Sequence, residues 1–225
     1  MTSTDHRPRV AAERRSKMRM RLLTSALQLT ATKGPLETTI DDVVKLAEVS
    51  RGTFYKYFSS PQELVQALAT EVSNQLIRLA ESQVVKDTDP AIRVANGLRL
   101  VSRLAVRHPL IANFLVRLGW PTVLGPDISL KYVQRDIDEG VRIGRFKRLP
   151  PPLAVNVVTT SVIASAHAML LSNCDGDFPE QAAAAVLRAL GLSDEEAQTA
   201  AFAPLMGIEE LAAQGWSSEL ADLPD

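Results

Sequence analysis

Apolar residues recur at intervals of three and four along almost the whole 225-residue chain, and short polar stretches with proline or glycine separate the apolar segments. This spacing places apolar side chains on one face of a helix, and no segment shows the alternation of a strand. The expected helices run over about 17–33, 40–47, 50–58, 60–79, 90–107, 108–118, 127–143, 153–173, 179–190 and 193–203, followed by a short amphipathic helix from Gly207. The pattern therefore predicts an all-α protein of about nine to eleven helices.

Capping signals mark several of the expected helix ends. Thr38 with Asp41 and Thr39 with Asp42 both have a spacing that resembles a capping box, in which each side chain accepts a hydrogen bond from the other residue's backbone amide. Ser60 and Glu63 repeat this spacing before the fourth helix. Gly34 ends the first helix, because glycine adopts the left-handed conformation that commonly follows a helix.

The composition divides the chain into three parts. Residues 1–16 are polar and basic and carry no apolar stripe, so we expect a disordered basic arm. Residues 17–84 form a first helical domain, which includes the long helix that begins near Ser60. A polar break ending at Pro90 leads into a second helical domain, over residues 85–225. The long helix would join the two domains mechanically.

The charge is distributed unevenly along the chain. The net charge is −1, but residues 1–58 contain eleven basic and six acidic side chains, so the rest of the chain carries −6. A basic end on an acidic body is typical of a nucleic-acid-binding domain attached to a sensing or dimerising domain. The single cysteine, Cys174, excludes an internal disulfide, so we expect a cytoplasmic protein.

Residues 50–58 have two unlike faces if they form a short helix. Phe54 and Phe58 are four residues apart and share one side, where they can be buried. The other side carries a guanidinium, an ammonium, phenols and a hydroxyl, which suit phosphates and base edges. Gly52 would let the backbone approach a partner closely. With the preceding helix and turn, this segment predicts a helix-turn-helix.

The run from about residue 19 to residue 68 resembles the DNA-binding domain of the tetracycline-repressor (TetR/AcrR) family of transcriptional regulators. Many positions at fixed spacing carry the resemblance, namely Leu22 to Ala31, Gly34, Thr39-Ile40, Ala47, Val49-Ser50, Gly52 to Tyr55, Tyr57-Phe58 and Leu64. The second domain resembles the family more loosely, through residues 138–140, 144–146 and 190–193. The resemblance implies a three-helix DNA-binding domain followed by a ligand-binding and dimerisation domain.

The resemblance and the residue types together indicate roles in DNA binding. Arg51 is expected to read a base, because a bidentate contact between guanidinium and guanine is the commonest specific pairing. The other expected DNA-contacting residues are Thr39, Gly52, Thr53, Tyr55, Lys56 and Tyr57. Two positions depart from the family pattern. Pro61 stands where the family often has lysine, and Asp41 would repel phosphate unless it accepts from a cytosine amine.

The second domain is expected to enclose an apolar cavity for a small-molecule effector, between the helices over about residues 90–173. Apolar bulk with a few polar groups is typical of such sites. The candidate pocket residues are Phe114, Leu118, Trp120, Tyr132, Asn156, His167 and Met169. A lone histidine in an apolar helix is more often a core residue than a ligand contact, and we expect this of His167.

A homodimer is expected, because two heads must read two half-sites about one helical turn apart or a multiple of it. Small side chains that would allow close helix packing are Ser161, Ala164, Ser165, Ala168 and Ala182 to Ala185. The same residues would serve equally well in packing within one chain.

Patterns typical of enzymes are absent from the sequence. It contains no phosphate-binding glycine loop, no nucleophile elbow and no metal-spaced cluster of histidine and cysteine, so we expect no catalytic residue, metal or cofactor. Residues 153–171 are long enough to span a membrane, but six polar side chains within them favour a buried helix in a soluble bundle.

The sequence thus predicts a ligand-responsive transcriptional regulator. Its simplest form is a repressor that leaves its double-stranded DNA operator when a small apolar or amphipathic molecule binds. Two alternatives stay open. One is a helical sensor that acts through a protein partner. The other is a helical enzyme that uses the second-domain cavity, with His167, Asp138 or Glu139 as the acid-base group.

Overall fold

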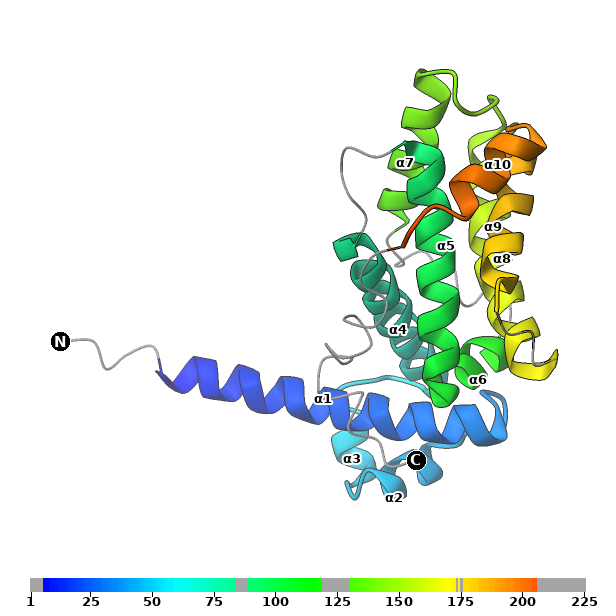
Figure 1. Cartoon of the computed structure of the whole chain (residues 1–225). Coiled ribbons are helices and arrows are strands. Elements are labelled where there is room, and N and C mark those ends of the chain that lie inside the picture. The colour runs from blue at the N-terminus through cyan, green and yellow to red at the C-terminus, as the bar shows by residue number, and fades with distance from the viewer. Residues whose placement is uncertain (1–5, 84–88, 119–129, 173, 175, 206–225) are drawn as a thin grey trace.

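The computed structural model describes residues 6–83, 89–118, 130–172, 174 and 176–205, and these residues form ten α-helices and no strand. The helices are α1 (His6–Lys33), α2 (Ile40–Leu46), α3 (Arg51–Phe54), α4 (Pro61–Gln83), α5 (Pro90–Arg107), α6 (Pro109–Leu118), α7 (Lys131–Arg142), α8 (Pro151–Ser172), α9 (Phe178–Ala189) and α10 (Asp194–Ala201). In Figure 1, α1 lies across the lower part of the molecule, with α2 and α3 below it and the other helices above it. The predicted all-α fold is confirmed, while the helix expected from Gly207 lies outside the described residues.

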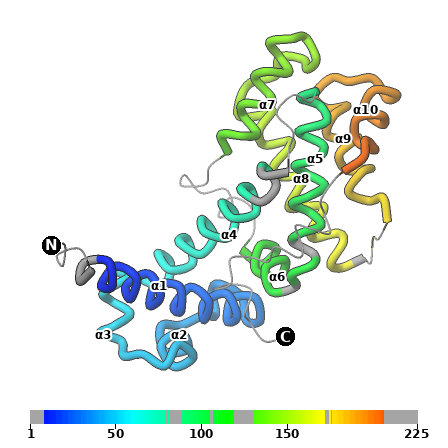
Figure 2. The backbone as a smooth tube through the Cα atoms, turned by 60° about the vertical axis from the view of Figure 1, so that its left-hand side comes forward, coloured from blue at the N-terminus to red at the C-terminus, as the bar shows by residue number. Residues whose placement is uncertain are grey.

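The first helix is longer than the sequence pattern indicated. α1 begins at His6, so the prediction of a disordered arm is wrong for residues 6–16, while residues 1–5 lie outside the described residues. No glycine or proline interrupts residues 9–33, and Arg9 pairs with Glu13 one turn later, at 3.5 Å. A helix can therefore continue here without an apolar stripe. Figure 2 shows the N-terminal part of α1 reaching outward from the body of the molecule.

A first hydrophobic cluster lies beneath the helix-turn-helix. Phe54 and Phe58 are 0% and 3% exposed, and their ring centroids are 6.0 Å apart, as the sequence predicted for the buried side of this segment. They share the cluster with buried leucines of α1 and α4. Ile111 and Phe114 of α6 belong to the same cluster, which therefore continues from the first domain into the base of the second.

The caps follow the predicted pattern with one exception. The Thr39 hydroxyl accepts from the Asp42 amide at 3.2 Å, and the Asp42 carboxylate accepts from the Thr39 amide at 3.3 Å, which confirms the capping box. At α4 the Ser60 hydroxyl accepts from the Glu63 amide as expected, at 3.1 Å. The Glu63 carboxylate, however, accepts from the Ser59 amide at 2.6 Å. Hydrogen bonds from the hydroxyl and amide of Ser59 lower the pKa of Glu63.

α5 is the central helix of the second domain and packs against α4 and α6 to α10. A second hydrophobic cluster lies around it, built from α5 and α7 to α10. The end of α7 approaches this cluster closely, because a Cβ on Gly140 would lie 2.1 Å from the buried ring of Phe146. Arg145 then pairs with Asp89 at 2.8 Å and with Glu196 at 2.7 Å. These contacts fix the turn after α7 against the starts of α5 and α10.

α8 is mainly apolar but is buried on only one side. Over Pro151–Leu171 it is long and apolar enough to cross a membrane, yet it packs against α5, α6, α7 and α9, and only 28% of its apolar window is buried. The outer side of the helix exposes Leu153, Asn156, Thr160, Ala164, His167 and Leu171. The expectation of a buried helix therefore holds only for the side of α8 that faces its neighbours, and the expectation of a core histidine at position 167 is wrong. The rotation of α8 turns these residues away from the protein core.

Candidate nucleic-acid interface and ligand cavity

α3 begins at a capped turn and carries polar groups on its outer side. The Ser50 hydroxyl accepts from the Thr53 amide at 3.1 Å and lies 3.0 Å from the Thr53 hydroxyl. Hydrogen-bonded turns continue the helix from Tyr55 to Phe58. Tyr55 is 55% exposed and Lys56 is also exposed, so both side chains are accessible to a partner.

Three other predicted DNA-contacting residues are partly buried, already bonded within the protein, or without a side chain that could make a contact. Tyr57 is half-buried against the first hydrophobic cluster. The Thr39 hydroxyl donates to the Asp42 carboxylate at 2.8 Å, so it already serves the cap of α2. A Cβ on Gly52 would make only an ordinary 3.7 Å contact with the Ser50 hydroxyl. The fold therefore does not require glycine there, which is consistent with close approach by an external partner.

Arg51 is held by the acidic residue that departs from the family pattern. Its Nε donates to Asp41 Oδ1 at 2.7 Å, and its Nη2 donates to Asp41 Oδ2 at 2.5 Å. The two side chains are 64% and 66% exposed, so the pair lies on the surface between the starts of α2 and α3. The hydrogen bonds from Arg51 lower the pKa of Asp41, and Asp41 in turn raises the pKa of Arg51. Both groups are therefore charged at neutral pH.

The N-terminal part of α1 adds cations beside α3. Arg14 and Arg15 of α1 share a surface depression with Lys56 and Tyr57. Both arginines are exposed, and they lie on the helix that continues into the first hydrophobic core. A rigid basic helix next to the exposed side of α3 can contact phosphates on either side of the bases that α3 reads.

A cavity of about 120 Å³ lies in the second domain, between α4, α5, α6, α7 and α8. Most of its wall is aliphatic, with side chains such as Leu98, Val133 and Val162. Gly97 also lines it, and a Cβ at that position would meet no atom within 4 Å. α4 forms part of the wall, in addition to the four helices that the sequence suggested.

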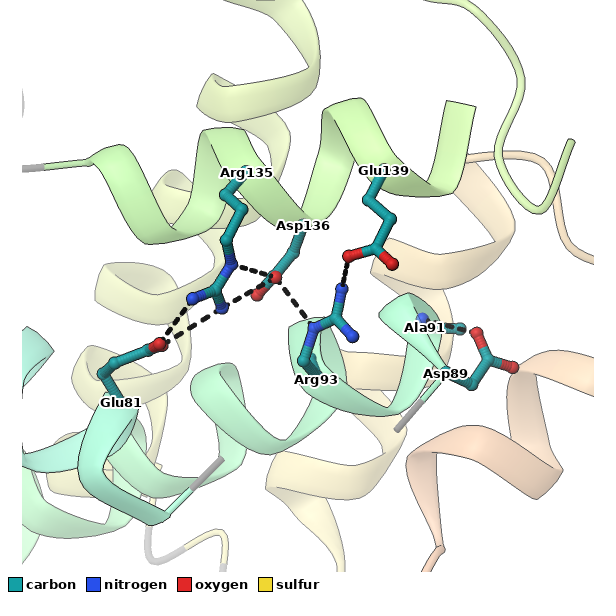
Figure 3. A network of polar contacts seen from close by, with 7 residues as sticks. All are labelled: Glu81, Asp89, Ala91, Arg93, Arg135, Asp136 and Glu139. Carbon is teal, nitrogen blue, oxygen red and sulfur yellow. Dashed lines mark hydrogen bonds and ion pairs between the residues drawn. The ribbon is translucent and has the colours of Figure 1, made fainter. Parts of the chain in front are cut away.

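The polar end of the cavity is lined by Glu81, Arg93 and Asp136. They belong to a network of five charged side chains from α4, α5 and α7, and Figure 3 shows the contacts within this network. Arg93 of α5 donates to Asp136 of α7 at 2.8 Å and also pairs with Glu139. Arg135 donates to Asp136 at 2.8 Å and to Glu81 of α4 at 2.6 Å. The bond to Glu81 contributes most to raising the pKa of Arg135. The network places two carboxylates, of Glu81 and Asp136, and the guanidinium of Arg93 at the cavity wall, and it connects α7 with α4.

The cavity differs from the pocket that the sequence suggested. Of the described candidates, Tyr132 lines it. Phe114 is fully buried in the first cluster, and Leu118 packs at the edge of that cluster. Asn156 and His167 lie on the exposed side of α8. Met169 is half-buried outside the cavity wall, and Trp120 lies outside the described residues.

The polar residues of the cavity were missed, although the sequence contains a signal for two of them. Arg93 is four residues before Gly97 and eight before Val101, so a charged residue stands within the apolar stripe of α5. Asp136 lies in the same way between Val133 and Ile137 of α7. Charged residues are almost never fully buried unless they are paired, so charges in both stripes indicate a buried ion pair.

Two protein-family models match this chain. The model described as the tetracyclin repressor-like C-terminal domain matches residues 89–202, and the model described as bacterial regulatory proteins of the tetR family matches residues 22–68. The chain belongs to the tetR family. The first match covers α5 to α10 with the cavity residues on α5 to α8, and the other covers the helix-turn-helix with part of α1 and α4. The sequence resemblance is thereby confirmed, and this tetR-family protein is a DNA-binding transcriptional regulator and not an enzyme.

Solved structures and curated relatives agree with this family. The structure of RolR in complex with resorcinol is 30% identical, with a TM-score of 0.70 over 88% of this chain and 99% of that one. A putative tetR-family regulator from Shewanella sp. PV-4 has the same fold, with a TM-score of 0.70 at 18% identity, over 78% of this chain and 99% of that chain. An HTH-type transcriptional repressor of Mycobacterium tuberculosis is 29% identical over 49% of this chain, and YvdT of Bacillus subtilis is 32% identical over 31%. These two alignments span 65% and 36% of the relatives' own lengths.

Proposed function

We propose that this protein is a cytoplasmic, homodimeric repressor that leaves its DNA operator when a small aromatic molecule occupies the second-domain cavity. The observation that carries this proposal is the course of α4. Leu64 and Leu68 of α4 belong to the core beneath α3, and Leu76 and Ile77 of the same helix line the cavity. One rigid element therefore contacts both the proposed DNA-reading unit and the proposed effector.

The proposed DNA-reading surface is the outer side of α3 with the basic part of α1. Arg51 reads a guanine, while Tyr55 and Lys56 contact neighbouring bases or phosphates. Thr39, Gly52, Thr53 and Tyr57 lie close to the backbone of the DNA as supporting contacts. Arg14 and Arg15 of α1 bind phosphates, which makes the affinity depend on salt.

The size and chemistry of the cavity support a single-ring effector. An engineered apolar cavity of about 150 Å³ in another protein binds benzene, so the 120 Å³ here suits a molecule of similar size. Asp136 and Arg93 at the polar end can accept from and donate to a hydroxyl substituent. RolR, which shares the fold and 30% of the sequence, was crystallised with resorcinol, a benzene ring with two hydroxyl groups. A phenolic compound is therefore the proposed effector class.

The Glu81–Arg135 ion pair connects effector binding in the cavity with DNA binding by the first domain. An effector that contacts Asp136 changes the partners of Arg135, and Arg135 holds the last turns of α4 through Glu81. A shift of α4 would move the core on which α3 rests. The effector can lower the affinity for DNA by no more than the ratio of two of its own affinities, one for the protein with α4 shifted and one for the protein with α4 in its DNA-binding position.

The proposed dimer interface is the exposed side of α8, which carries both apolar and polar residues, with the adjoining side of α9. Ala164 and Leu171 of α8 and Ala185 of α9 are exposed, whereas Ser165 and Ala184 are buried within the protomer. The former group is therefore available for a second copy. Sedimentation equilibrium should give a mass of twice 24.5 kDa. A monomer at micromolar concentration would contradict the dimer.

The function is tested by measuring binding to DNA from the protein's own upstream region, titrated with salt and with single-ring phenols. We expect sequence-selective binding that weakens steeply with salt and that a phenol reverses. Long-chain or multi-ring compounds that exceed the cavity serve as negative controls. If the protein binds DNA selectively but no phenol reverses this binding, the protein is still a transcriptional regulator, but phenols are not its effectors.

Gly97→Leu should make the repressor insensitive to its effector. The leucine side chain would occupy the cavity, because the Cβ direction from Gly97 meets no atom within 4 Å. We expect unchanged DNA binding without the effector and at least about tenfold weaker release by the phenol, since a filled cavity cannot bind it. Competition between DNA and effector, measured by fluorescence anisotropy, gives both quantities.

Gly97→Ala is the matched control for this substitution. Alanine is favoured over glycine in a helix interior by about 1 kcal/mol, so this variant should unfold at higher temperature and still respond to the effector. If Gly97→Leu responds as well as the wild type, the effector binds somewhere other than in this cavity.

A further inference from the structure

We propose that Asp41 is a positioning residue that fixes Arg51 for guanine and thereby sets the sequence specificity of the protein. This inference rests on the proposed DNA-reading function of α3. It assigns a use to the acidic residue that, by charge alone, opposes DNA binding.

The geometry of the pair leaves the reading edge of the guanidinium available. A guanidinium has five N–H groups, and Asp41 accepts a hydrogen bond from two of them, one on Nε and one on Nη2 of Arg51. Both Nη1 hydrogens and the second Nη2 hydrogen point away from the carboxylate. Guanine O6 and N7 accept from two parallel N–H groups, which the Nη1–Nη2 edge supplies. Arg51 can therefore bind Asp41 and guanine at the same time.

The pair also restricts how Arg51 can move. The side chain of a free arginine loses considerable rotamer freedom when it binds a base. Here two hydrogen bonds that the guanidinium donates to Asp41 of α2 already hold it, at 2.7 and 2.5 Å. Part of the ordering is thus complete before DNA arrives, and the orientation is defined by two helices. Preorganisation of this kind favours the one base that matches the orientation.

The carboxylate acts against incorrect DNA as well. An unpaired arginine is attracted to any phosphate, whereas the Arg51–Asp41 pair has no net charge and brings a carboxylate to the same surface. Asp41 can accept from the amine of a cytosine or adenine next to the guanine, but a phosphate or a carbonyl edge offers it no donor. The pair therefore weakens non-specific binding more than binding to the cognate site.

Stability of the fold does not account for the pair. Both side chains are more than 60% exposed, and an exposed ion pair contributes little to folding. Asp41 also lies outside the capping box of α2, which Thr39 and Asp42 form. Asp41 lies in the first turn of α2, where an exposed carboxylate adds only a small stabilisation, so removing its charge should lower the unfolding temperature only slightly and leave the effects on DNA interpretable.

The test compares Asp41→Asn with Glu48→Gln in the full-length protein. Glu48 lies in the turn between α2 and α3 and pairs with Arg21 of α1 at 2.8 Å, so its variant removes an equal charge without touching Arg51. For each variant we would measure affinity for the operator, for the operator with the guanine position substituted, and for random DNA. Asp41→Ala is added because asparagine keeps one acceptor oxygen.

We expect both amide variants to bind random DNA more tightly than the wild type, because each loses one negative charge. Only Asp41→Asn and Asp41→Ala should lose discrimination at the guanine position, by about tenfold. The wild type and Glu48→Gln should discriminate equally.

Two results would overturn the inference while the proposed function stands. One is unchanged discrimination in both Asp41 variants of a selectively binding protein. The other is tighter operator binding with equal or greater discrimination, which would make Asp41 a competitor of DNA for Arg51. A wild-type protein without any operator preference would instead refute the DNA-reading function itself.

Discussion

Arg51→Ala should abolish selective operator binding while leaving most of the non-specific affinity. Arg51 is the first residue of α3, and its side chain is 64% exposed on the proposed reading surface. A bidentate contact with guanine changes affinity roughly 10- to 100-fold per half-site. In a dimer the two half-sites multiply, so we expect a loss on the order of 10²- to 10⁴-fold. Electrophoretic mobility shifts with operator and random DNA measure both affinities.

Arg51→Lys separates charge from geometry in this experiment. Lysine keeps the positive charge but lacks the planar fork that matches two acceptors, so it should retain non-specific binding and lose discrimination. In both variants the slope of affinity against salt should remain close to that of the wild type, because the arginines of α1 still bind phosphate. An Arg51→Ala protein that keeps its operator preference would refute base reading by this residue.

Glu180→Gln should lower the free energy of unfolding more than substitution of an exposed ion-pair residue does. Glu180 of α9 is 5% exposed and accepts from Arg99 and from Arg103, both at 2.7 Å. Arg99 is itself buried and also donates to the backbone oxygen of Ala203. A neutral glutamine leaves the buried guanidinium of Arg99 without its counter-charge. Removing one partner of a buried pair costs about 3–5 kcal/mol, a large part of the stability of a typical domain.

The same carboxylate gives the stability a pH dependence. Burial by itself raises the pKa of Glu180, but hydrogen bonds and charges of Arg103 and Arg99 outweigh it, and the net pKa is lowered. A lowered folded-state pKa stabilises the protein above the pKa of the unfolded carboxyl, which is about 4.3. This contribution is lost as the pH falls through the folded-state value. Urea unfolding from pH 7 to pH 3 should therefore show the wild type approaching Glu180→Gln in stability.

Asp194→Asn is the exposed control for this prediction. Asp194 pairs with Arg188 at 3.4 Å and is 87% exposed, so its removal should cost at most about 1 kcal/mol. A Glu180→Gln protein as stable as this control would show that the buried pair contributes nothing net. Because the effect lies in the second domain, DNA binding of the folded fraction should be preserved in both variants.

Local chemistry explains why much of the fold was predictable. Phe54 and Phe58 stand four residues apart, and their burial follows from helix geometry once the helix exists. The Thr39–Asp42 cap is formed within four residues, so its partners are visible in the sequence. The extension of α1 was missed because the prediction relied on an apolar stripe, whereas an uninterrupted helix can continue through residues 6–16 into solvent.

The sequence by itself determined the order of the helices, the cap of α2, the aromatic core of the helix-turn-helix and the family. The tertiary structure alone decided which side of α8 is exposed, which side chains meet at the cavity, and that Asp41 holds Arg51. Those features depend on the rotation and packing of helices against one another. Arg93 and Asp136 are 43 residues apart, and Arg99 and Glu180 are 81 apart. Helical periodicity places each charge on a face of its own helix, but only the packed fold brings that face to its partner.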